Sequence, residues 1–169
     1  MESNFRPMTK TALVLALGLA VFASNPAYAA IAWTNLLGGN WSDSSNWNPN
    51  QVPGTSDDVV ITNTGTITVT LDVSATVNSL RLGGNSGQQT LAMAGNNLTV
   101  NNDSQVQSHG RLQLDGGSLG GVGGLTIQGQ LNWSGGRLDV GSRLQVATNG
   151  SVVANAGAVG NLLEFLAAC

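Results

Sequence analysis

Apolar and polar residues alternate along most of the chain beyond residue 58, and in its second half the alternation repeats. Residues 110–119 (GRLQLDGGSL) align with residues 129–138 (GQLNWSGGRL) at an offset of 19, and residues 125–127 (LTI) return as 144–146 (LQV) at the same offset. Alternation of this kind has the period of a strand with one buried face. Short strands separated by Gly-Gly at a fixed period indicate a solenoid, in which stacked coils bury each other's apolar faces.

The spacing of the apolar positions predicts how many strands make up each coil. Leading apolar positions recur at intervals of 6 to 11 along the chain, while the equivalent positions Leu91, Leu112 and Leu131 are offset by 21 and 19. Three strands therefore fit in one coil, with a coil period of 19–21. We predict an all-β fold, a right-handed parallel β-helix. The alternative is a β-sandwich, which also uses short strands and frequent turns but does not require equivalent residues at a constant offset.

The register of the repeats predicts the core and the corners. Trp133 should lie directly above or below Leu114, about one strand spacing (~4.8 Å) away. The Gly-Gly pairs at 116–117 and 135–136 should form corners, where positive φ is needed. Eleven apolar side chains are expected to point inward: Leu112, Leu114, Leu119, Leu125, Ile127, Leu131, Trp133, Leu138, Val140, Leu144 and Val146.

The amino-terminal segment, residues 1–29, has the features of a cleaved signal peptide. Arg6 and Lys10 give a positive start, residues 11–22 form an apolar run, and residues 27–29 (AYA) supply a small-x-small cleavage site. The apolar run is shorter than the ~20 residues that span a bilayer. We predict export with cleavage after Ala29, to a secreted or outer-surface location with no remaining membrane span.

The rest of the chain divides into three segments. Residues 30–58 are rich in tryptophan and in turn-forming residues, and residues 59–155 hold the predicted coils. Residues 156–169 break the pattern, either as a cap over the last coil or as the truncated end of a longer protein. The only cysteine is Cys169, so no intrachain disulfide can form and the fold depends on stacking and backbone ladders.

Charge limits the classes of partner. Charged residues make up 9% of the chain and the net charge is −3, with six lysines and arginines in total. Too few cations are present to neutralise a phosphate backbone, which argues against nucleic acid as a partner. No cofactor motif is found.

The residues that could bind a ligand lie in segment 30–58. Aromatic faces and carboxylates there could form a platform for sugar rings, and the aspartates could collect calcium, which prefers six to eight oxygen ligands. The alternative, which we favour, is structural. The tryptophans cap the first coil, Asp43 and Asn46 form Asx turns, and Asp57 and Asp58 form a turn into the strand at 59–61. Six residues make up this candidate binding set: Trp41, Asp43, Asn46, Trp47, Asp57 and Asp58.

The same segment carries a family resemblance. Residues 38–47 (GGNWSDSSNW), 52–61 (VPGTSDDVVI), 68–72 (TVTLD) and 76–80 (TVNSL) resemble the opening of large secreted β-helical proteins of bacteria, of the autotransporter-passenger and filamentous-adhesin type. In those proteins a similar opening leads into glycine-rich coils. The resemblance covers about residues 30–155. It implies a cell-surface or extracellular protein that binds glycans or host and matrix proteins.

Catalytic residues are not predicted. β-Helical enzymes stack acidic or basic groups on adjacent coils, but Asp115 is followed one coil on by Ser134, and Asp139 is preceded one coil back by Gly120. Glycoside hydrolysis needs two facing carboxylates. His109 is expected to be a lone, exposed loop residue. We therefore expect a non-enzymatic adhesin-like protein; the alternative is the amino-terminal part of a carbohydrate-active enzyme whose catalytic coils are absent from this chain.

Overall fold

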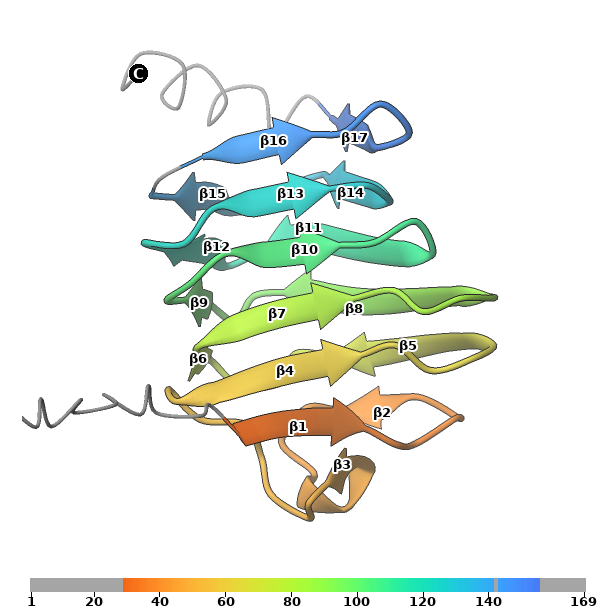
Figure 1. The fold of residues 1–169 in the computed structure, drawn as a ribbon. Helices are drawn as coiled ribbons and strands as arrows, with labels where there is room; N and C mark the ends of the chain where they lie inside the picture. The colour runs from red at the N-terminus through yellow and green to blue at the C-terminus, as the bar shows by residue number, and fades with distance from the viewer. Residues whose placement is uncertain (1–28, 142, 156–169) are drawn as a thin grey trace, which may run out of the picture.

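The computed structural model describes residues 29–141 and 143–155, which form a three-sided stack of coils (Figure 1). The predicted signal peptide, apart from its last residue, and the predicted carboxy-terminal cap lie outside these residues. Three sheets run along the stack, and we name them A, B and C. Among the described strands every pair is parallel except β1 with β3.

Sheet A has seven strands: β3 (Trp47–Asn48), β1 (Ala29–Trp33), β4 (Asp57–Ile61), β7 (Ser79–Leu82), β10 (Ser104–Val106), β13 (Leu125–Ile127) and β16 (Leu144–Val146). Sheet B has six: β2 (Gly39–Asn40), β5 (Thr66–Thr70), β8 (Gln88–Ala94), β11 (Gly110–Gly116), β14 (Gln130–Trp133) and β17 (Ser151–Ala154). Sheet C has four: β6 (Ala75–Val77), β9 (Leu98–Val100), β12 (Ser118–Gly121) and β15 (Arg137–Val140). A short 3₁₀ helix, η1 (Ser44–Asn46), lies between β2 and β3.

The handedness can be followed in Figure 1. The strands of sheet A point to the right at the front while the chain climbs from β1 to β16, which is the sense of a right-handed helix. The prediction of a β-helix with three strands per coil is confirmed, and the β-sandwich alternative is wrong because consecutive coils pair in parallel.

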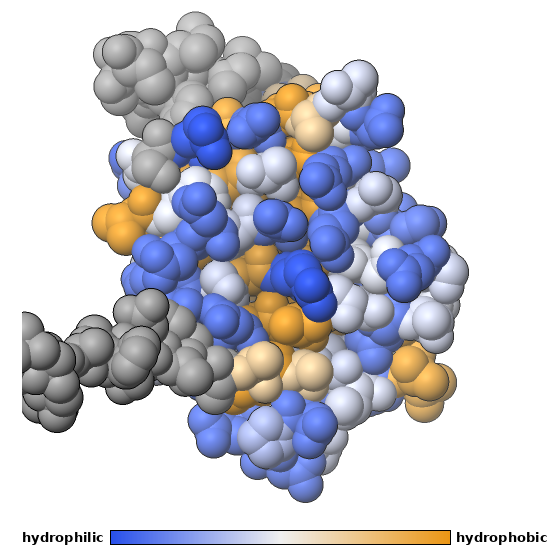
Figure 2. Space-filling model, in the orientation of Figure 1, coloured by the Kyte–Doolittle hydropathy of each residue, from blue (hydrophilic) through white to orange (hydrophobic). Residues whose placement is uncertain are grey.

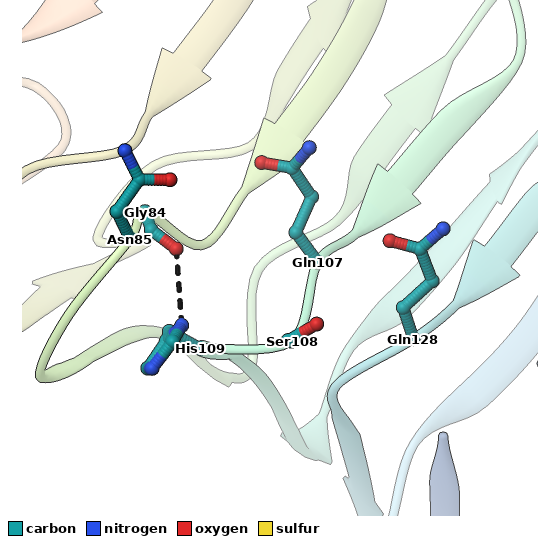
Figure 3. A pocket seen from close by; sticks show the side chains of 6 residues that line it. All are labelled: Gly84, Asn85, Gln107, Ser108, His109 and Gln128. Carbon is teal, nitrogen blue, oxygen red and sulfur yellow. Dashed lines mark hydrogen bonds between the residues drawn. The ribbon is translucent and has the colours of Figure 1, made fainter. Parts of the chain in front are cut away.

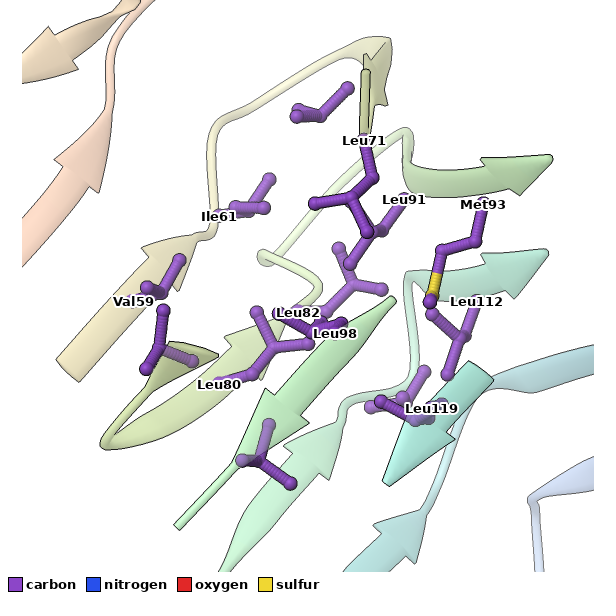
Figure 4. Packing of buried hydrophobic residues seen from close by; sticks show 14 of the residues in the cluster. Val59, Ile61, Leu71, Leu80, Leu82, Leu91, Met93, Leu98, Leu112 and Leu119 are labelled. Carbon is purple, nitrogen blue, oxygen red and sulfur yellow. The ribbon is translucent and has the colours of Figure 1, made fainter. Parts of the chain in front are cut away.

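The repeat register is confirmed residue by residue. Leu112 pairs with Leu131 and Leu114 with Trp133 on sheet B, and Gly120 pairs with Asp139 on sheet C. Inward side chains from the three sheets form one continuous apolar core, part of which is drawn in Figure 4. A residue that recurs at a fixed offset therefore packs on its own equivalent, which is why the pattern can be read from the sequence.

Nine of the eleven residues predicted to point inward are buried. The prediction fails on β16, where Leu144 is only half-buried and Val146 is 46% exposed. β16 is the last strand of sheet A in the described part of the chain, so no described strand pairs with its outer edge. Burial in a solenoid requires a neighbour on both sides.

The early coils differ from the repeats in length. Ile31 pairs with Val59 at an offset of 28, and Leu82 pairs with Val106 at an offset of 24. The offset of 21 is present between Val59 and Leu80 and between Leu91 and Leu112, but offsets of 19–21 hold on every sheet only from β10 onward. Segment 30–58, expected to be rich in loops, contains strand β1, which completes the first coil against β4. Residues 77–82 are divided between β6 and β7.

The corners are built by residues with special backbone or side-chain capacity. In each predicted corner pair the second glycine has positive φ, +69° at Gly117 and +71° at Gly136. At the corner between β6 and β7, Asn78 donates its side-chain amide to Asp58 Oδ1 at 2.6 Å and its backbone N–H to Asp57 O at 2.9 Å. Asn78 therefore ends β6 where the apolar pattern alone does not show a break.

Candidate functional site

The tryptophans of the candidate binding set lie inside the molecule. Trp41 and Trp47 are 0% and 1% exposed, and their rings meet edge to face with centroids 4.9 Å apart. Trp33 packs on Trp47 at the same centroid distance. Trp47 Nε1 donates to Trp41 O at 2.8 Å. The three rings close the core at the amino-terminal end of the stack, so their faces are covered and offer no platform for a sugar ring.

Asp43 and Asn46 shape the loop that carries these rings. Asp43 caps η1: its Oδ1 accepts from the backbone N–H of Ser45 at 2.9 Å and from Ser45 Oγ at 2.7 Å. The hydrogen bond from the Ser45 hydroxyl, and to a lesser extent the one from the Ser45 backbone N–H, hold the pKa of Asp43 below its ordinary value. Asn46 is buried and donates to Asn40 O at 3.0 Å while accepting from Asn35 Nδ2 at 2.8 Å. Both side chains are used to build turns.

Asp57 and Asp58 act at the start of β4. Asp57 is buried, and its Oδ2 accepts from the N–H of Gly54 at 2.8 Å, which closes the turn before the strand. Asp58 Oδ1 accepts from Asn78 and from Ser79 Oγ, both at 2.6 Å, and thereby ties two coils together. Within residues 29–141 and 143–155, no three histidine, cysteine, aspartate or glutamate side chains come together in a way that could hold a metal ion.

Asp72, which is not among the predicted site residues, belongs to the same end of the stack. Its carboxylate accepts from the backbone N–H of Ser42 at 3.0 Å and from Ser42 Oγ at 2.6 Å. These bonds join the loop that follows Trp41 to the residues that follow β5. Partial burial works against ionisation of Asp72, but the hydrogen bonds outweigh it, and the pKa lies below its ordinary value. One feature of the sequence could have identified Asp72: it directly follows the alternating stretch 66–71 (TITVTL).

A polar patch lies on the outer face of sheet B, over β11 and β14. Asp115 accepts from Gln113 Nε2 at 2.5 Å and from the Ser134 hydroxyl one coil on. With its amide oxygen turned towards Arg111, Asn132 accepts from the guanidinium Nε and Nη2 at 3.0 and 2.6 Å. A hollow of about 190 Å³ lies among these residues. Their hydrogen-bonding groups are largely used on one another.

A second polar hollow, of about 260 Å³, lies at the corner where the chain passes from sheet A to sheet B (Figure 3). The amide side chains of Asn85, Gln107 and Gln128 line it together with Ser108. His109 is exposed there, as expected of a loop residue, and its Nδ1 lies 3.1 Å from Gly84 O. The sequence carries only a weak signal for this set: Gln107 and Gln128 each directly follow a strand of sheet A.

Comparison with known proteins adds no family. No family model matches the sequence, and no curated protein or solved structure is detectably similar to the chain. In the part of the chain that the structure describes, no helix has the length and apolar character required to cross a membrane.

Proposed function

We propose that the chain is an exported, non-enzymatic surface or extracellular protein of the adhesin-like kind, which binds carbohydrate or protein partners through the sides of its solenoid. The observation that carries the proposal is the regular display of mostly uncharged polar side chains on stacked coils. On sheet A, Arg81, Gln105, Thr126 and Gln145 follow one another in a single outward column. Figure 2 views this face and shows polar residues spread over it.

The positions of the carboxylates support a binding role over a catalytic one. Asp115 lies against Ser134, and Asp139 lies against Gly120 and forms an exposed ion pair with Arg137 at 3.5 Å. Neither arrangement supplies the facing pair of carboxylates that hydrolysis of a glycosidic bond usually needs.

Export agrees with the geometry of the first strand. Cleavage after Ala29 leaves Ala30, Ile31 and Ala32, which pair with Asp58, Val59 and Val60 of β4. The mature chain would therefore keep most of the ladder that joins its first coil to its second.

Two measurements on the expressed full chain test the proposal. Mass spectrometry of the secreted form should find Ala30 at its amino terminus, and the purified protein should be retained on immobilised polysaccharides or matrix proteins. An intact Met1 in a membrane fraction contradicts export, and a failure to adhere to any of these surfaces contradicts the binding role.

A further inference from the structure

The hollow in Figure 3 is one part of a longer groove. A hollow of about 300 Å³ shares Gly84, Asn85 and Gln107 with it, and another of about 350 Å³ shares Ser108 and Gln128. Together the three hollows run along the corner between sheets A and B. They extend from Thr62, which follows β4 in the chain, to Asn149, in the loop that follows β16. Each coil contributes the residues that directly follow its strand of sheet A. We refer to this continuous surface as the corner groove.

Stacking places the groove residues in register. The backbone N–H of Gln107 donates to Leu82 O, and that of Gln128 donates to Val106 O, both at 2.7 Å. One coil further on, the backbone N–H of Ala147 donates to Ile127 O at 2.8 Å. Gln107 and Gln128 therefore lie on consecutive coils, about one strand spacing (~4.8 Å) apart. Figure 3 shows their two amide side chains extending in the same direction.

The groove differs from the patch on sheet B because its amide side chains are free of hydrogen bonds within the described part of the protein. Among the described residues, the side-chain amides of Asn85, Gln107 and Gln128 make no hydrogen bond, and neither does the Ser108 hydroxyl. Amides offer both donors and acceptors. A ligand can use these groups without first breaking contacts within the protein.

The charge of the groove selects the class of ligand. Of the described residues that line the three hollows, Arg81 and His109 are the only ones with a basic side chain, and none is acidic. This is too little positive charge for a nucleic acid or a polyanionic sugar. An added peptide strand needs a free sheet edge, but the backbone N–H groups of Gly83, Gln107 and Gln128 already bond to the preceding coil.

We propose that the corner groove binds a neutral polysaccharide chain that runs parallel to the solenoid axis, with about one sugar ring on each coil. The coil rise of ~4.8 Å is close to the length of one pyranose unit in an extended chain, so successive rings would meet successive amides. The inference rests on the proposed binding function and names its ligand and its site. Since each coil adds hydrogen bonds, affinity should rise with chain length and level off once all the coils of the groove are occupied.

The test uses soluble neutral oligosaccharides two to six units long: β-1,4-linked glucose, β-1,3-linked glucose, β-1,4-linked mannose and β-1,4-linked N-acetylglucosamine. Binding to the mature protein is measured by calorimetry and NMR titration. The variant is Gln107→Ala with Gln128→Ala. The matched control, Gln51→Ala with Gln130→Ala, removes two exposed glutamines that lie outside the groove and outside the outward column of sheet A. Thermal unfolding checks that both variants fold.

We expect at least one series to bind with affinity that increases with length, and the groove variant to bind its hexamer about tenfold more weakly or worse, from two lost hydrogen bonds. The control variant should bind as the wild type does. Equal binding by the groove variant, or no binding by any of the four series, overturns the corner groove. Preferential binding of polygalacturonate, abolished by Arg81→Gln, overturns the neutral ligand. In each of these cases retention on immobilised surfaces remains a separate test of the binding function.

Discussion

Trp133→Ala is the most informative single change in the repeat region. Trp133 is 1% exposed and stacks between Leu114 and Ala154, in a column that continues down to Met93. A buried aromatic side chain removes about 150–250 Å² from water, which at ~25 cal/mol per Å² amounts to about 4–6 kcal/mol as an upper bound. Allowing for partial collapse of the cavity, we expect the free energy of unfolding to fall by about 3–5 kcal/mol.

Urea denaturation of residues 30–169, followed by far-UV circular dichroism, measures this loss. Trp133→Leu is the matched control, because leucine already occupies the equivalent position at Leu114 and fills part of the cavity; we expect it to cost about 1–3 kcal/mol. A one-residue shift in register would place the ring on the outside of sheet B. A loss below about 1 kcal/mol for Trp133→Ala, typical of surface changes, would refute the register.

Three further predictions concern the corners and the amino-terminal end. Gly117→Ala should lower stability by about 2 kcal/mol or more, because its φ is +69° and a Cβ would collide with backbone; in the same denaturation assay Gly95→Ala, with open space around it, should be close to neutral. Trp41→Ala should lower the melting temperature and leave glycan affinity unchanged, since the ring is buried; loss of binding at constant stability would instead identify a sugar platform. Asp72 has a lowered pKa in the folded state, so its stabilisation is present above the ordinary aspartate value and lost as pH falls through the folded pKa. Asp72→Asn should therefore lower the melting temperature at pH 7, and the melting temperature of the variant should fall less on acidification than that of the wild type. Parallel profiles of melting temperature against pH for the two proteins would contradict this.

The repeat region could be predicted because its energetics are local and periodic. Leu112 and Leu131 occupy the same place in consecutive coils, and the apolar-polar alternation fixes which side chains face the core. The first coils could not be read in this way, because their lengths vary with inserted loops. The break at Asn78 depends on a hydrogen bond to Asp58 from the previous coil, which no local pattern in the sequence reveals.

The candidate site was harder to predict for a different reason. Tryptophans in a turn-rich segment suit both a sugar platform and a core cap, and only the burial of Trp41 and Trp47 distinguishes the two. Conversely, Gln107 and Gln128 look like ordinary exposed amides in the sequence. They become a set only when the coil register brings them onto neighbouring steps of one corner.

We propose that this solenoid binds its partners without transforming them. The most direct measurement incubates the purified mature protein with a panel of polysaccharides and follows, in the same samples, the protein retained and the reducing ends or unsaturated products released. We predict retention on at least one polymer with no release of products above the level without protein. Depolymerisation by the wild type that disappears in Asp115→Asn or Asp139→Asn would contradict the account.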